Sequence, residues 1–312
     1  MIVDIKKIED KFIEAKEKSK KYDSSILFSI TDNIKADFNS LIDFSISTCK
    51  EKVYISQGIE KKEFIGWGNI LTLNQNKINA DINHYINQII KNQVDCNLGV
   101  EQCKAIFIGG QNFNINIPNQ NIWNDFPSFN YQIPLILLSS QDNLSTITFN
   151  FLINKNSEIL NIYNSVKDYL KKIKNYLLDT NKRPVHHLAL EKIGFYNNNF
   201  PERFFKIKNK INNSSLEKVI ISDIMHYTFS GDFPYKKLLL ELKNTYPECT
   251  IFLYDYGSKG KYLGASPEKI FSLENSKLEI DALAGSVNRE NNKSDKENIE
   301  FILNDKKINE EH

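Results

Sequence analysis

Lys218 and Glu268 are the two residues whose type and setting could support acid–base chemistry. Lys218 lies in the short apolar run L-E-K-V-I-I-S-D (216–223), which predicts a strand. A lysine at a strand end is most often a surface residue, whereas a lysine buried beside a carboxylate has a lowered pKa and can act as a general base. Glu268 directly follows Ser266-Pro267, a turn signal within L-G-A-S-P-E-K-I-F (263–271). Taken alone, Glu268 is interpreted as a solvent-facing side chain.

Two further features could bind a ligand. The small residues Ala284, Gly285 and Ser286 follow a predicted strand, and small residues let a ligand approach the backbone closely. In most proteins such a triplet is no more than a turn. Glu311 lies in the terminal E-E-H, whose carboxylates are hard oxygen ligands suited to Mg²⁺, although a solvated helix end has the same composition.

The histidines and cysteines indicate no further metal site. His186, His187 and His226 have no partner at metal-ligand spacing, so we interpret them as structural or surface residues. The four cysteines, at positions 49, 96, 103 and 249, form neither a C-x-x-C pair nor a zinc pattern. Free thiols in a reducing compartment are expected.

Composition describes a globular chain with balanced charge. Of 312 residues, 41% are hydrophobic and 25% are charged, which suffices for a core and excludes a disordered chain. Forty basic residues against 39 acidic ones leave no electrostatic footprint for nucleic acid or an anionic membrane. The charged first residues do not resemble a signal peptide, and no apolar stretch reaches spanning length. A cytoplasmic protein is expected.

Hydrophobic periodicity predicts the elements that must position these side chains. Apolar residues at helical spacing predict helices near the N-terminus and at 82–92, 158–178, 201–211, 234–246 and 293–312. Short β-rich runs predict strands at 25–30, 52–57, 62–68, 104–110, 131–139, 145–153, 218–222 and 250–256, with two or three more in 262–282. The segment 181–199 is interpreted as a linker or loop. Strands joined mostly by short turns favour an α+β fold with antiparallel sheets and packed helices. We expect a sheet-rich region at 1–190 and a second region at 191–312.

Taken together and in this order, the motifs resemble the chorismate-utilising enzymes, and within them the isochorismate synthases. The matching strings are K-V-I-I at 218–221, L-G-A-S-P-E at 263–268, A-L-A-G-S at 282–286 and D-K-K-x-x-x-E-H at 305–312. The stretch 107–134 also fits the family pattern, as does F-I-G-W-G at 64–68. The resemblance covers most of the chain.

The resemblance implies a Mg²⁺-dependent conversion of chorismate to isochorismate. Water would add at ring carbon 2 while the hydroxyl at carbon 4 leaves. Lys218 would take the proton from the water, and Glu268 would protonate the leaving hydroxyl. Residues 284–286 would line the pocket, and Glu311 would hold the metal. The implied partner is chorismate alone, bound by a monomer without nucleic acid or membrane.

Three departures from the family pattern leave alternatives open. Ser286 stands where the family usually has threonine, and Asp223 stands near the position of an arginine. Family members also continue past the E-H motif, so we expect an N-terminal fragment with a chorismate-binding region incomplete at its C-terminus. A salicylate synthase, which shares the lysine, and a non-catalytic remnant are the alternatives. The sequence does not distinguish a menaquinone from a siderophore pathway.

Overall fold

The computed structural model is described in eleven stretches of the chain. They are residues 5–74, 82–100, 105–114, 123–142, 144–179, 189–195, 199–216, 218–231, 233–274, 276–288 and 294–312. His186, His187 and Cys103 lie outside them. Cys49, Cys96 and Cys249 are free thiols, as expected.

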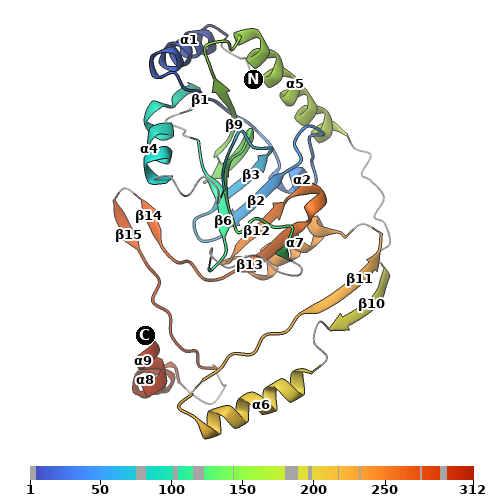
Figure 1. Ribbon diagram of the computed structural model, residues 1–312, viewed down its shortest axis with the longest axis vertical. Coiled ribbons are helices and arrows are strands. Elements are labelled where there is room, and N and C mark those ends of the chain that lie inside the picture. Colours follow the sequence, from blue (N-terminus) through green and yellow to red (C-terminus); the bar gives the residue numbers. More distant parts are fainter. Residues whose placement is uncertain are drawn as a thin grey trace.

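An eight-stranded sheet forms the centre of the molecule (Figure 1). Every neighbouring pair is antiparallel except β1 and β5, which run parallel. The mostly antiparallel arrangement confirms the predicted α+β class. The spatial order of the strands is β13 (Lys261–Ser266), β12 (Thr250–Asp255), β2 (Lys52–Gln57), β3 (Lys62–Trp67), β8 (Ile136–Gln141), β9 (Leu144–Ile153), β1 (Ile26–Asn33) and β5 (Val94–Leu98).

Amphipathic helices pack against the central sheet and share its main core. In α1 (Ile5–Tyr22), Ile8, Phe12 and Ala15 are buried at the predicted helical spacing. The buried residues of α5 (Ile159–Leu178) and Leu239 of α7 (Tyr235–Thr245) join the same cluster. The short helix α2 (Phe38–Leu41) contributes both of its terminal side chains.

A three-stranded sheet, in the order β4 (Leu71–Asn74), β7 (Phe129–Ile133) and β6 (Ile108–Gln111), carries smaller apolar clusters. In one of these, Ile108 packs with Val53 of β2 and Leu137 of β8. Helix α4 (Ile82–Asn92) lies beside β1.

Both predicted regions contribute to the central sheet. Strand β12 pairs with β2 in six-residue register, from Thr250 opposite Gln57 to Asp255 opposite Lys52. Residues of α7 and β12 therefore belong to the same core as the first region. The division at residue 190 stays a prediction.

Most of the remaining elements lie away from the sheet, in the lower part of Figure 1. One hairpin lies instead at the left, level with the sheet, and its Glu274 is 3.7 Å from Lys62 of β3. Few of their apolar side chains are buried, and Ile220, Ile270 and Leu283 are each at least 80% exposed. These elements are β10 (Ala189–Phe195) paired with β11 (Met225–Ser230), α6 (Phe200–Asn213), the hairpin β14 (Ser272–Glu274) and β15 (Lys277–Glu279), α8 (Asp295–Asn304) and α9 (Lys306–Glu311).

Two local predictions are wrong. Residues 218–224 form no strand, and the strand of that part of the chain begins instead at Met225. The predicted loop at 181–199 contains β10, while 181–188 lie outside the described residues. No helix in the described stretches combines the length and apolar character needed to cross a bilayer.

Candidate functional site

Lys218 lies on the extended segment between α6 and β11, and α6 fixes the end of that segment. Arg203 of α6 donates from Nη2 to the carbonyl oxygen of Ser222 at 2.9 Å. Its Nη1 lies 3.8 Å from Oδ1 of Asp223. Asp223, near the position where the family usually has an arginine, is thus paired with an arginine that comes from α6. Lys218 itself is exposed.

Glu268 lies two residues after the end of β13, at the edge of the eight-stranded sheet. The Ser266 hydroxyl donates to the carbonyl oxygen of Glu268 at 3.2 Å, and the Glu268 N–H lies 3.4 Å from the same hydroxyl oxygen. Lys269 pairs with Glu60 at 3.2 Å, which ties this segment to the turn between β2 and β3. The predicted turn is therefore present, and the Glu268 side chain is exposed.

The predicted pocket loop lies against α9, the helix that carries the predicted metal ligand. Gly285 has a φ of +73°, and a Cβ placed there would lie 2.6 Å from side-chain atoms of Ile308 in α9. Only glycine adopts this backbone conformation readily, so its use here lets the loop lie close against α9. Glu311 follows Ile308 by three residues, about one turn further along the same helix. Ala284 is half-buried, whereas Ser286 and Glu311 are exposed.

The structure does not bring the two proposed catalytic side chains together. Among the described residues, no hydrogen bond or ion pair joins Lys218 to Glu268 or links either one to Glu311. The described residues also contain no group of three His, Cys, Asp or Glu side chains able to hold a metal ion. The roles of these residues therefore remain predictions.

A small hollow of about 260 Å³ lies beside the predicted pocket loop. It is lined by Val287, which follows that loop, and by Glu297, Asn298 and Phe301 of α8. Asn298 is buried, although sequence reasoning did not single it out. Its signal in the sequence is a polar residue at the i position of an apolar i, i+3, i+4 pattern completed by Phe301 and Ile302.

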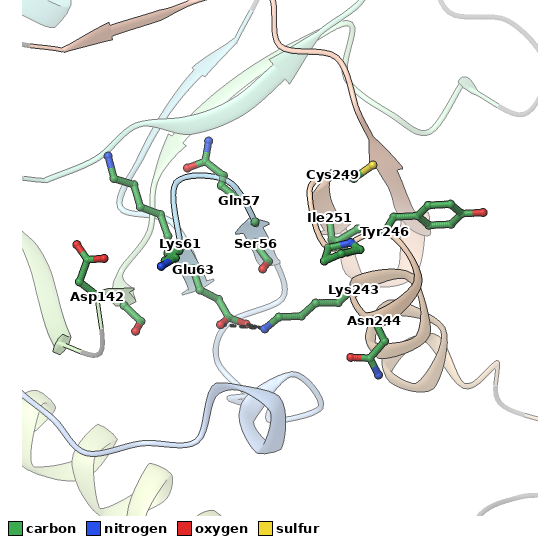
Figure 2. A pocket seen from close by; sticks show the side chains of 14 residues that line it. Ser56, Gln57, Lys61, Glu63, Asp142, Lys243, Asn244, Tyr246, Cys249 and Ile251 are labelled. Carbon is green, nitrogen blue, oxygen red and sulfur yellow. Dashed lines mark hydrogen bonds and ion pairs between the residues drawn. The ribbon is translucent and has the colours of Figure 1, made fainter. Parts of the chain in front are cut away.

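A larger hollow of about 610 Å³ lies elsewhere, between the β2–β3 turn and the end of α7 (Figure 2). Across it, Lys243 Nζ contacts both carboxylate oxygens of Glu63, at 3.0 and 3.1 Å. Tyr54 donates to the same carboxylate at 2.7 Å, and burial together with this negative charge raises the pKa of Tyr54. None of the predicted site residues lines this hollow.

Comparison with models of known protein families identifies the family of this chain. The family model for chorismate binding enzymes matches residues 11–312. The chain belongs to this family. The sequence matches no curated protein.

Two solved structures share the fold. MenF, the menaquinone-specific isochorismate synthase from Escherichia coli, aligns with 96% of this chain and 66% of its own, with a TM-score of 0.64 and 15% identity. DhbC from Bacillus anthracis, assigned as a 2,3-dihydroxybenzoate-specific isochorismate synthase, aligns with 87% of this chain and 58% of its own, with a TM-score of 0.52 and 15% identity. The chain thus spans less than two thirds of the length of either relative's chain, and likeness at this identity shows the fold alone.

Proposed function

We propose that the protein acts as an isochorismate synthase, adding water at carbon 2 of chorismate with loss of the hydroxyl at carbon 4. The observation that carries the proposal is the family match across 11–312. The roles proposed for Lys218 and Glu268 rest on the resemblance of K-V-I-I and L-G-A-S-P-E to the family's motifs. The shared fold with two isochorismate synthases supports it.

The reaction needs a base and an acid on opposite sides of the ring. Lys218, as the neutral amine, would accept a proton from the attacking water, and Glu268, as the acid, would donate one to the departing hydroxyl. Burial favours the neutral form of both groups, because it disfavours charge. Both side chains are exposed in the structure, so the proposal requires that bound substrate, or chain packed around it, covers them.

Mg²⁺ is the proposed cofactor, and when bound it would neutralise a substrate carboxylate. Glu311 alone does not make a magnesium site, because Mg²⁺ takes six oxygen ligands and the described residues contain no group of three His, Cys, Asp or Glu side chains able to hold a metal ion. We assign Glu311 as one ligand of Mg²⁺. Oxygen atoms of the substrate, of water and of other residues would supply the remaining ligands.

A salicylate synthase remains the second candidate, because that branch of the family shares the lysine. The two activities differ in product: the first leaves the enolpyruvyl group on the ring, and the second expels it as pyruvate. Incubation of the full chain with chorismate and Mg²⁺, followed by chromatographic separation of isochorismate, salicylate and pyruvate, distinguishes them.

Substitution of the acid–base pair tests the roles directly. Lys218→Ala and Glu268→Gln should each lower turnover by about 10²–10⁴-fold while chorismate binding changes little, because each acts mainly in the transition state. Exposed residues of the same types, changed in Lys210→Ala and Glu300→Gln, are matched controls and should leave turnover unchanged. A wild-type chain that forms no isochorismate contradicts the activity. Turnover that survives in the Lys218 and Glu268 variants contradicts the assignment of roles.

A further inference from the structure

Asn298 is a buried amide with no hydrogen-bonding partner. It is 5% exposed, and neither Oδ1 nor Nδ2 has a partner among the described residues. Helix α8 begins one turn earlier with a capping box, in which the Glu297 carboxylate accepts from the Ser294 N–H at 2.7 Å and from its hydroxyl at 2.8 Å. The position of Asn298 is therefore set by a well-defined helix start.

A buried amide without a partner is costly. A buried donor or acceptor left unsatisfied loses its hydration without a replacement, and an asparagine has capacity for both. Leucine has nearly the same shape and would occupy this apolar helix face without that cost. An amide at this position is thus best explained by a polar group that enters from outside the described residues.

The hollow beside Asn298 has the character of a small-ligand site. Val287 and Phe301 give it apolar walls, and Glu297 is already held by Ser294. The Asn298 amide is accordingly the uncommitted polar group among its lining residues. Through Val287 the hollow adjoins Ala284–Ser286, the loop proposed to line the chorismate pocket. A ring with an apolar face and a polar substituent fits this lining.

We propose that Asn298 is a substrate-binding residue that fixes the position of chorismate. Nδ2 donates to a carboxylate oxygen of the substrate, and Oδ1 accepts from a hydroxyl or water that enters with it. This inference rests on the proposed function, because it takes chorismate as the ligand. It adds a recognition residue on α8, separate from the acid–base pair and from Glu311.

The test compares chorismate binding by wild type, Asn298→Leu and Asn298→Gln, with Asn304→Leu as the matched control. Asn304 is an exposed asparagine on the same helix whose amide bonds to the Glu300 backbone. Titration calorimetry with chorismate and Mg²⁺ should show at least tenfold weaker binding for Asn298→Leu, partial recovery for Asn298→Gln and no change for Asn304→Leu. In turnover, Asn298→Leu should raise KM more than it lowers kcat.

Thermal unfolding separates recognition from a structural role. Asn298→Leu should melt at the same temperature as wild type or higher, because it removes an unsatisfied amide. Unchanged chorismate binding by Asn298→Leu overturns the inference, as does weaker binding that merely follows a lowered melting temperature. A wild-type chain that binds no chorismate contradicts the proposed function itself, and the inference falls with it.

Discussion

Lys52 shows how a single buried charge shapes the pH response of the protein. Its Nζ donates to the Ile42 carbonyl at 2.6 Å and to the Tyr235 hydroxyl at 3.1 Å, beneath the start of α7. Burial lowers the pKa of Lys52 to about 8, against the opposing attraction of Asp255 and Asp43. The charged amine is therefore tolerated in the fold but is less favourable there than in water.

Stability should consequently rise with pH across the range in which Lys52 loses its proton. Because the folded pKa lies below that of the unfolded chain, the unfolded state binds more protons between the two values, and the free energy of unfolding increases there. Urea titrations at pH 7.5 and 9.5 should differ by roughly 2 kcal/mol from this group. Above pH 10 the gain should reverse, because burial raises the pKa of Tyr54 and Tyr254, which the unfolded chain ionises more readily.

Lys52→Met removes the titrating group and should flatten the rise between pH 7.5 and 9.5. The neighbouring exposed lysine provides the control, and Lys50→Met should keep the wild-type profile. A wild-type profile in Lys52→Met would show that other groups produce the pH response.

Buried polar residues, inside and outside the candidate site, are features that the sequence does not predict. Lys52 and Asn298 are both of residue types that usually face solvent, and their burial depends on elements far away in the chain. By contrast, the Ser266 turn follows from local residue types and was predicted. Small residues at 284–286 predicted close approach of a ligand, whereas the structure shows Gly285 close to Ile308 of α9. Features set by local residue types can therefore be predicted from the sequence, whereas burial by distant elements cannot.

At the scale of elements, the contact between the β2–β3 turn and the α7–β12 connection closes one end of the sheet. A Cβ placed on Gly58 would lie 1.7 Å from the backbone carbonyl oxygen of Pro247. Neither partner is a flexible side chain, so Gly58→Ala must move backbone. We expect it to destabilise the protein by about 1–3 kcal/mol in urea unfolding. Gly110→Ala, where a Cβ meets nothing within 4 Å, should have much less effect. Equal stability of the two variants would contradict this packing.

Most elements of the central sheet were predictable because each pairs with a neighbour that its pattern also predicts. Strand β2 is found at 52–57 as expected, and β3 occupies all but the last residue of its predicted run. The apolar run at 218–222 has the same composition but pairs with no strand among the described residues, so it stays extended without a ladder. Strand β10 was missed because residues typical of loops flank it, Pro184 on one side and Asn197–Asn199 on the other.

Across the whole molecule, burial divides the chain into two unequal parts. Most of the core side chains come from the central sheet and the helices packed on it. Residues 218–224 and 280–288 instead run without regular structure, and carry the exposed Ile220, Ile280 and Leu283. The monomeric state and the cytoplasmic location remain predictions.

This division predicts two classes of hydrogen exchange. Amides of β1, β8 and β9, held in ladders on both sides, should exchange only on global unfolding, whereas those of 218–224 and 280–288 should exchange within seconds. Mass spectrometry of peptides from both parts of the same sample measures the contrast, with the sheet peptides as the internal reference. An apolar dye should also bind the native protein, because the exposed side chains offer it a surface. Uniform protection across both parts, with no dye binding, would show that these segments are packed in solution.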